Sequence, residues 1–467
     1  MIALAQLMVT LDATIVNVSL PAAQTDLEFS DASRPWVITS YALAFGALLL
    51  LGGRLGDVFG RRKVFLTGVA GFAAASALAG AASSLGVLVA GRGLQGVFAA
   101  LLAPSALSLL STTFTQPRER ARAFSVFGTV AGTGGAVGLL LGGVLTDTLS
   151  WRWTLYINVP IAVAVWLGGI AVLSRQGKRA AGGVDAVSAL LAAGGLFNVV
   201  FGLSNAEVNG WGHILTWGSM ANGVVVLALF VRRQGRTAQP LLPLRIVKDR
   251  DRGASLIAVA TSAAGMFSVL LFLTYYLQLV HGLSPTMTGI AFLPLIAALM
   301  AATQIAARWV VPFLGVRWTV PTGLLLQGVG LMDLAALDSG SGYGAVLPGL
   351  LLFGAGMGLV MPTSMSTGTA RVAAEDAGAA SATINTAQQV GGAAGVALLS
   401  TVAASASASF AASHPSSALP AQAAGYSAAF AVAAKISALG AVVTAVLYRS
   451  SDNRRRSTVV AAAESRN

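Results

Sequence analysis

Uncharged apolar runs long enough to cross a lipid bilayer recur along the sequence, and no other feature limits its possible folds so strongly. The hydrocarbon core of a bilayer is about 30 Å thick, so a helix needs about 20 residues to span it. We therefore predict an all-α polytopic membrane protein. Its fourteen expected spans lie at roughly 1–22, 36–55, 64–83, 86–113, 122–146, 154–173, 185–204, 212–231, 254–280, 286–308, 318–337, 343–367, 379–403 and 426–448. The Ala/Ser-rich link 404–425 is predicted as either a loop or a surface helix.

The composition agrees with membrane insertion and limits the possible chemistry. Of the 467 residues, 55% are hydrophobic and only 10% are charged, whereas soluble domains carry about 25% charged residues. There is no cysteine, which excludes disulfides, thiolate metal sites and cysteine nucleophiles. His213, His281 and His414 fall in predicted loops or at the edge of a predicted span, without metal-ligand spacing. We therefore expect no metal or cofactor, and a polytopic enzyme or receptor is the less favoured class.

The positive charges predict the orientation of the spans. Most of the 29 Lys and Arg residues fall in alternate predicted loops, whereas the loops between them hold only Arg34 and Arg152. Such an excess of basic residues marks the cytoplasmic side of a membrane protein. We therefore expect a multi-pass protein of the cell membrane with both termini in the cytoplasm. The net charge of +12 reflects this topology, so nucleic acid is not an expected partner, whereas the lipid bilayer is.

A weak internal repeat predicts two halves of the same orientation. The cluster GGAVG at 134–138 recurs as GGAAG at 391–395, and Arg118 has an echo in Arg371 at nearly the same separation. Parallel repeats of this kind occur in transporters. We predict a six-helix N-terminal half over 1–173 and a six-helix C-terminal half over 254–448. Residues 174–253 would hold two inserted spans with basic linkers, and 449–467 would form a basic cytoplasmic tail.

Two charges inside predicted spans are not repeated in the second half. Asp12 lies about 15 Å deep in the first span at 1.5 Å per residue, and Arg92 lies in the fourth. The equivalent positions fall near Met266 and Leu347. Charges inside a membrane are costly and usually functional, so we expect a water-accessible cavity to hold Asp12. The sequence leaves open whether Asp12 also pairs with Arg92. The alternatives are a helix-interface hydrogen bond or an early span end for Asp12, and snorkelling at a span end for Arg92.

Two glycine-containing segments are candidates for moving parts. The short basic loop GGRLGDVFGRRK at 52–63 is interpreted as a cytoplasmic gate whose arginines pair with carboxylates across the two halves, or as a plain stop-transfer charge cluster. Its candidate residues are Gly53, Asp57, Gly60, Arg61 and Arg62. Glycines spaced by three and four in the fifth span predict close helix packing, which would also slide if the halves rock. These candidates are Gly134, Gly138, Gly142 and Gly143.

Polar and aromatic residues elsewhere in the spans are candidates for a substrate cavity. Aromatic faces together with a carboxylate suit amphipathic or lipophilic cations, although tyrosines near span ends can equally be interfacial anchors. The candidates are Thr14, Asn17, Gln95, Tyr275, Tyr276, Gln278, Asn385 and Gln389.

Several segments together resemble the fourteen-span drug:proton antiporters of the major facilitator superfamily. The resemblance rests on LDATIVNVSLP at 11–21, GGRLGDVFGRR at 52–62, RGLQG at 92–96 and the glycine run 128–145, with support from WRWTLYINVPI, FLTYYLQLVHGLSP and INTAQQVGGAAGVAL. The chain departs from the family pattern at three positions. Val58 replaces a basic residue, Phe98 a glycine, and Leu139 the proline of the antiporter motif.

The resemblance implies alternating access between two halves and proton-coupled efflux of amphipathic drugs or antibiotics. Asp12 and Arg92 would then couple transport to protons, and the protein would act as a monomer without a cofactor. Leu139 keeps an importer or facilitator of a small organic solute open as the alternative.

Overall fold

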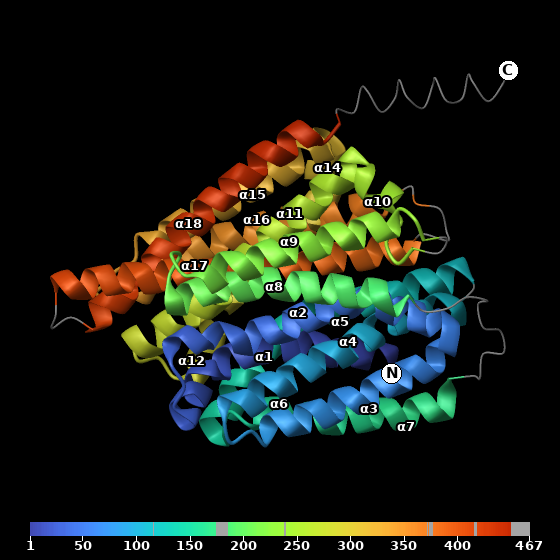
Figure 1. Cartoon of the computed structure of the whole chain (residues 1–467), viewed down its shortest axis with the longest axis horizontal. Helices are drawn as coiled ribbons and strands as arrows, with labels where there is room; N and C mark the ends of the chain where they lie inside the picture. Colours follow the sequence, from blue (N-terminus) through green and yellow to red (C-terminus); the bar gives the residue numbers. More distant parts are fainter. Residues whose placement is uncertain are drawn as a thin grey trace.

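In the computed structural model, every regular element of the described residues is a helix. The structure describes residues 1–114, 116–173, 185–237, 240–370, 372, 377–414 and 418–449. Most of the predicted basic tail, most of the linker after residue 173, and Arg371 lie outside this part of the chain. The helices lie alongside one another in one elongated bundle (Figure 1).

The helices fall into three successive groups along the chain. The first group is α1 (Ile2–Leu27), η1 (Asp31–Ser33), α2 (Arg34–Phe59), α3 (Arg61–Gly80), α4 (Leu85–Thr113), α5 (Pro117–Thr148), α6 (Trp153–Tyr156) and α7 (Asn158–Val172). The second is α8 (Ala186–Asn209), α9 (Ile214–Gln234) and the short α10 (Leu244–Lys248). The third is α11 (Arg250–Ser268) with π-helical turns η2 (Val269–Leu273) and η3 (Tyr276–Val280), α12 (Pro285–Ala291), α13 (Leu293–Ile305), η4 (Ala306–Val310), α14 (Val311–Leu314), α15 (Val316–Ala335), α16 (Tyr343–Thr369), α17 (Ala377–Ser413) and α18 (Ala418–Leu447).

Thirteen helices in the described residues are long and apolar enough to cross a membrane. Each predicted span has a helical counterpart, but α15 is not among the thirteen, because Arg317, Gln327 and Asp333 reduce its hydropathy. The number fourteen therefore stays a prediction. The link 404–425 extends the flanking helices as far as Ser413 and from Ala418, so its described part is neither a loop nor a separate surface helix. The 37 residues of α17 reach about 55 Å at 1.5 Å per residue, well beyond a bilayer core.

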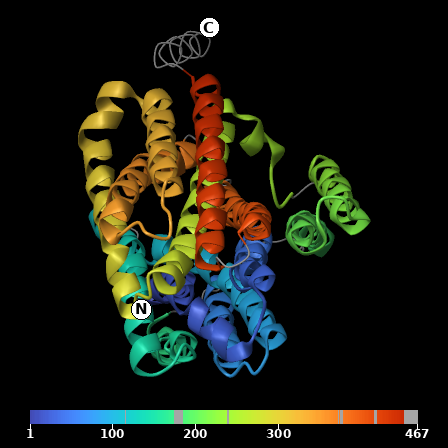
Figure 2. The same ribbon diagram turned by 90° about the vertical axis from the view of Figure 1, so that its left-hand side faces the viewer.

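The first and third groups form two bodies, and the second packs beside them. In Figure 2, α1–α7 occupy the lower part, α11–α18 the upper part, and the pair α8–α9 stands apart at one side. Helix α8 contacts α2 of one body and α17 of the other, and Trp36 lies against the stacked rings of Phe197 and Phe201. Asp185 caps α8 and accepts a hydrogen bond from Arg233 of α9, which ties the two helices together. This hydrogen bond lowers the pKa of Asp185 to about 2.

The apolar core is shared at one end of the bundle and divided at the other. We call the end with the α2–α3 loop the basic end, and the end with the α1–α2 connection the opposite end. One large cluster joins both bodies, and its members from the first body, such as Val18, Val37 and Trp151, lie from mid-helix toward the opposite end. Toward the basic end, the first body has its own cluster, which only Ala382 of the second body joins, and the second body has another. The bodies are therefore sealed together at the opposite end.

The glycines of α5 fall into two kinds of contact. A Cβ added at Gly138 would lie 2.1 Å from Thr14 Oγ1, and the neighbouring Gly134 and Gly142 also face α1, within the same body. Gly143 instead faces the second body, where an added Cβ would lie 2.5 Å from the Pro285 carbonyl oxygen. We predicted that the whole glycine face could slide between the two bodies. Of these four glycines, only Gly143 contacts the second body.

We predict that Gly143→Ala loosens the closed opposite end. The added methyl group meets the backbone of α12, and overpacking of this kind costs about 1–3 kcal/mol, enough to change a two-state population roughly fivefold or more. The protein has no cysteine, so the single substitution Ala22→Cys reports access to the shared cluster, against which Ala22 packs. We expect a membrane-impermeant thiol reagent to label Ala22→Cys at least roughly fivefold faster when Gly143→Ala is also present.

The matched control is Gly128→Ala in the same helix, because a Cβ added there meets nothing within 4 Å. Equal labelling rates in the Gly143→Ala and Gly128→Ala backgrounds would show that Gly143 does not hold the two bodies together.

Candidate functional site

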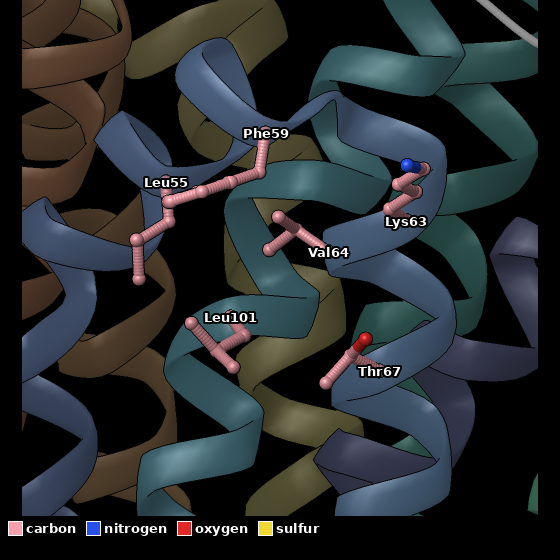
Figure 3. A pocket seen from close by; sticks show the side chains of 6 residues that line it. All are labelled: Leu55, Phe59, Lys63, Val64, Thr67 and Leu101. Carbon is pink, nitrogen blue, oxygen red and sulfur yellow. The ribbon is translucent and has the colours of Figure 1, made fainter.

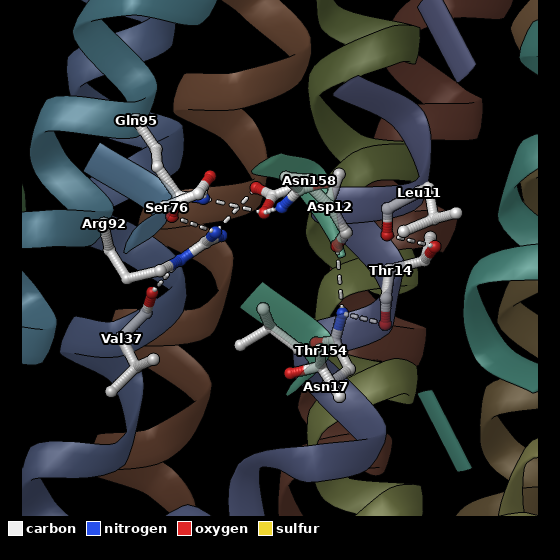
Figure 4. Close-up of polar contacts among 12 residues, drawn as sticks. Leu11, Asp12, Thr14, Asn17, Val37, Ser76, Arg92, Gln95, Thr154 and Asn158 are labelled. Carbon is white, nitrogen blue, oxygen red and sulfur yellow. Dashed lines mark hydrogen bonds and ion pairs between the residues drawn. The ribbon is translucent and has the colours of Figure 1, made fainter. Parts of the chain in front are cut away.

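The two unrepeated charges meet in the interior of the first body. Asp12 lies in the middle of α1 and Arg92 on the facing side of α4, and their side chains are 0% and 3% exposed. Arg92 Nη1 donates to Asp12 Oδ2 at 2.7 Å. Figure 4 shows the pair surrounded by side chains from neighbouring helices, including Ser76 of α3 and Asn158 of α7.

The carboxylate of Asp12 accepts hydrogen bonds from three different side chains. Besides Arg92, Gln95 Nε2 donates to Asp12 Oδ1 at 2.9 Å and Asn158 Nδ2 donates to the same oxygen at 2.8 Å. All three donors are N–H groups, which is the arrangement that an ionised carboxylate requires. Gln95 also donates to Ser76 Oγ at 2.7 Å, so α1, α3, α4 and α7 are joined by one polar network.

Arg92 is held from several directions. Its Nε donates to the Val37 carbonyl at 3.2 Å, its Nη1 donates to Gln95 Oε1 at 2.8 Å, and its guanidinium lies 4.5 Å from the centre of the Tyr41 ring. This geometry excludes snorkelling at a span end. A buried charge pair is stable only when further hydrogen bonds complete it, and here they do.

The predicted water-accessible cavity at Asp12 is not present in this conformation. Asp12, Gln95, Ser76 and Asn158 have no exposed surface, and Arg92 is 2% exposed. Side-chain donors thus replace water around the carboxylate. Two polar atoms next to the network have no hydrogen-bond partner, namely Tyr41 Oη and Asn158 Oδ1.

Ser76, Asn158 and Tyr41 were not identified from the sequence as site residues. Asn158 lies in the quoted segment WRWTLYINVPI and is an amide near the start of an apolar helix, which is a usable signal. Ser76 carries no such signal, because a serine in a membrane helix often bonds only to its own backbone.

The predicted cavity residues have divergent surroundings. Thr14, Asn17 and Asn385 each donate to backbone carbonyls of their own helices. Gln389 packs against Gly46 of α2. Gln278 donates to the Val18 carbonyl at 2.9 Å, across the two bodies.

The two tyrosines also differ from each other. Tyr276 donates to the carbonyls of Asp338 and Ser341 within its own body, so it does not face the first body. Tyr275 donates to Gln24 Oε1 at 2.8 Å and therefore bridges the two bodies.

A second polar network, which unlike the first joins the two bodies, closes the opposite end, and the sequence did not indicate it. Arg34 lies 3.9 Å over the ring of Tyr275, pairs with Asp31, and donates to Gln24 Oε1 at 2.6 Å. It also donates to Tyr426 Oη of α18 at 3.4 Å. One of the few cations of the predicted outer loops is therefore part of the seal between the bodies.

The α2–α3 loop is a turn whose two adjacent arginines bond within the first body. Gly60 joins the two helices with φ of +94°, a conformation that other residues rarely adopt, whereas Gly53 makes only ordinary contact with Pro104. Arg61 pairs with Asp57 at 3.3 Å, and Arg62 donates to the Ile170 carbonyl of α7. The predicted pairing of these arginines with carboxylates across the two halves is thus wrong in this conformation, because both are already bonded within the first body.

A cleft of about 230 Å³ lies beside this loop, between α2, α3 and α4 (Figure 3). Leu55, Phe59, Val64 and Leu101 make it apolar, and Lys63 and Thr67 stand at its edge. None of its lining residues belongs to the Asp12 network, so the cleft does not provide access to the buried pair.

The sequence of the chain matches known proteins along most of its length. Residues 2–396 match the family described as Major Facilitator Superfamily. The chain belongs to the major facilitator superfamily. It is therefore a multi-pass membrane transporter, and the all-α polytopic fold predicted from the sequence is confirmed.

Relatives of this transporter are named for resistance and export. It is 45% identical to the puromycin resistance protein pur8 of Streptomyces alboniger, over 96% of this chain and 90% of that protein. It is 37% identical to the cephamycin export protein CmcT of Amycolatopsis lactamdurans, over 74% of this chain and 73% of that protein. It is 36% identical to the tetracenomycin C resistance and export protein of Streptomyces glaucescens, over 73% of this chain and 64% of that protein.

Solved structures share the fold of this transporter at low sequence identity. An auto inhibited POT family peptide transporter aligns with a TM-score of 0.69 at 17% identity, over 96% of both chains. A bacterial homolog of the human lysosomal transporter Spinster aligns with a TM-score of 0.65 at 15% identity, over 96% of this chain and 95% of that chain.

We predict that Arg92 stabilises the folded transporter chiefly by neutralising the buried charge of Asp12. Removing one partner of a buried charge pair costs about 3–5 kcal/mol, so Arg92→Leu should lower the free energy of unfolding by about that amount. Adding Asp12→Asn removes the unpaired charge and should restore most of the loss. Unfolding of the purified variants in detergent, followed by temperature or denaturant, measures both effects.

The control is Arg152→Leu, because Arg152 pairs with Asp26 at an exposed site where a charge pair contributes about 1 kcal/mol or less. The energetic coupling of the pair is refuted if the double variant is no more stable than Arg92→Leu alone.

Proposed function

We propose that this transporter is a secondary active exporter that exchanges protons for amphipathic, antibiotic-like compounds. The observation that carries the proposal is the fully buried Asp12–Arg92 pair, present in only one of two otherwise similar bodies. The export and resistance names of relatives up to 45% identical support the direction of transport and the substrate class.

The proposed cycle begins from the conformation described above. We place the basic end in the cytoplasm and the protein in the cell membrane as a monomer, with both termini inside, following the distribution of Lys and Arg. The shared cluster and the Arg34 network then close the outer side. In this state the carboxylate of Asp12 is paired with Arg92 and shielded from water.

Rocking of the two bodies would break the outer seal and change the surroundings of Asp12. When the outer side opens, water and a proton can reach the carboxylate, and protonation removes the charge that holds Arg92. When the inner side opens again, Asp12 releases the proton to the cytoplasm and re-forms its pair with Arg92. The compound binds from the cytoplasm and leaves on the outer side before the proton binds there. One proton then enters for each exported compound, which makes the inward proton gradient the energy source. No cofactor takes part in this cycle.

The substrate would bind between the bodies, where residues of both can contact it. Tyr275 and Gln278 already contact the first body, and Gln389 lies against α2. Aromatic and amide groups at such a seam suit molecules with a ring system and a polar or cationic group. Tyr276 faces away from the first body and is left out of this proposed site.

One observation favours a second candidate function. Helix α5 continues without a break from Pro117 to Thr148, with Leu139 at the position where the antiporter motif has a proline. A facilitator or importer without proton coupling would not need the kink that the proline supplies. The two candidates differ in their response to a collapsed proton gradient.

The experiment is an efflux assay with a panel of aromatic amines and antibiotics in deletion and overexpressing cells, with and without a protonophore. We expect overexpression to lower the cellular content of some compounds and the protonophore to abolish this effect. Efflux that continues unchanged with the protonophore would refute proton coupling and favour the second candidate, a transporter without proton coupling.

We predict that Asp12→Asn abolishes uphill transport and leaves the protein in the membrane. The amide still bonds to neighbouring side chains but cannot gain or lose a proton, so it uncouples the two bodies' movement from the gradient. Substrate accumulation in inverted vesicles with an imposed pH gradient should fall to the level of empty vesicles. The control is Asp333→Asn, outside the Asp12 network, which should accumulate substrate normally. Uphill accumulation by Asp12→Asn would exclude this residue from coupling.

A further inference from the structure

Asn158 is fully buried against Asp12, yet only one end of its amide is used. Its Nδ2 donates to Asp12 Oδ1 at 2.8 Å, whereas its Oδ1 has no hydrogen-bond partner. Buried side-chain oxygens without a partner are uncommon in proteins and call for an explanation.

Protonation of Asp12 would change what its neighbours must supply. The new O–H group needs an acceptor, but Arg92, Gln95 and Asn158 all present N–H groups to this carboxyl. Gln95 Oε1 and the Val37 carbonyl already accept from Arg92, and Ser76 Oγ accepts from Gln95. The amide oxygen of Asn158 is free, and it is attached to the same carbon as the nitrogen that already contacts Asp12.

A half-turn about the Cβ–Cγ bond exchanges the two ends of this amide. That torsion in asparagine has a broad, roughly two-fold energy profile, so both orientations are accessible without moving α7. Either orientation leaves one end of the amide without a partner, and the two therefore differ chiefly in what they offer to Asp12. An ionised carboxylate selects the N–H end, and a protonated carboxyl selects the carbonyl end.

We propose that Asn158 is a positioning residue for proton transfer, and that its amide turns by half a revolution each time Asp12 gains or loses its proton. This inference rests on the proposed proton coupling and names a residue that serves it. No atom is transferred to Asn158, because the proton stays on Asp12 and only the hydrogen bond changes direction, from N–H···O⁻ to O–H···O=C.

Few ionisable groups face this amide, which makes its effect on pH dependence measurable. Among the described residues, Asp12 of α1 contacts it directly, Arg92 of α4 contacts Asp12, and Tyr41 of α2 lies against Arg92. Ser76 of α3 adds only a hydroxyl group. A change at Asn158 therefore acts on the hydrogen bonding of the Asp12 carboxyl.

The test compares Asn158→Leu, which keeps the size but removes both hydrogen-bonding ends, with Asn158→Thr, whose hydroxyl can both donate and accept. A hydrogen bond to a charged group is stronger than one to a neutral group, so Asn158→Leu should favour the protonated state. We expect the pH at half-maximal exchange in liposomes to rise by about one unit. Asn158→Thr should stay closer to the parent, and it also covers the case in which Asn158→Leu does not fold.

The turn itself is tested by infrared difference spectra of the purified full-length protein between high and low pH. The parent should show the carboxyl band of protonated Asp12 together with a shifted side-chain amide band. Both bands should be absent from Asp12→Asn, and the amide band should be absent from Asn158→Leu and Asn158→Thr. The control is Asn198→Leu in α8, where the asparagine bonds to the Gly194 carbonyl, outside the network; it should match the parent in both measurements.

The outcomes separate the two proposals. If the Asp12 band titrates but no amide band accompanies it, or if Asn158→Leu keeps the parental pH profile, the turn is refuted and proton coupling at Asp12 stands. If the carboxyl band does not depend on Asp12, proton binding at this residue is refuted, and the turn of Asn158 is refuted with it.

Discussion

A carboxylate that has no access to water must find all its hydrogen-bond donors inside the protein, and the first body is arranged to provide them. Asp12 of α1 receives donors from Arg92 and Gln95 of α4 and from Asn158 of α7, while Ser76 connects α3 to the same network. Separating α1 from α4 would leave a buried charge unpaired, which is strongly unfavourable. Loss of α3 or α7 would leave buried polar groups without a hydrogen-bond partner. The polar network therefore makes the first body behave as one unit.

The contacts between the two bodies are of a different kind. Inside the first body, α1 and α5 approach each other through Gly134, Gly138 and Gly142, where no side chain could be added without displacing a neighbour. Between the bodies, close glycine packing is found at Gly143, and the seal toward the opposite end also depends on an apolar cluster and on the hydrogen bonds of Arg34, Tyr275 and Gln278. Nearer mid-helix, Thr386 of α17 donates to the Gly46 carbonyl of α2. Rigid units joined by a limited and partly polar seam are what alternating access requires.

Much of this architecture could be predicted from the sequence, because the membrane imposes simple rules on length and charge. Helices appear wherever uncharged runs of about 20 residues were found, and Asp12 and Arg92 were identified as charges inside spans. The alternatives of an early span end and of snorkelling were excluded only by the structure. The failures occurred where the outcome depended on long-range geometry. The bonds of Arg61 and Arg62 and the separate directions of Tyr275 and Tyr276 depend on which helix lies opposite, and no local pattern encodes that. Asn158 could have been noticed as a lone amide, but only its distance from Asp12 gives it a role.

The placement of α8 and α9 makes the two seams of the molecule unequal toward the lipid. Helix α8 contacts both α2 and α17, and thus covers the seam where these two helices meet, whereas the seam between α5 and α12 lies on the side of the molecule away from α8 and α9 (Figure 2). Acyl chains can therefore reach one seam directly, while protein stands between them and the other. A compound dissolved in the bilayer would meet the transporter with a preferred side, and lateral entry would be directional.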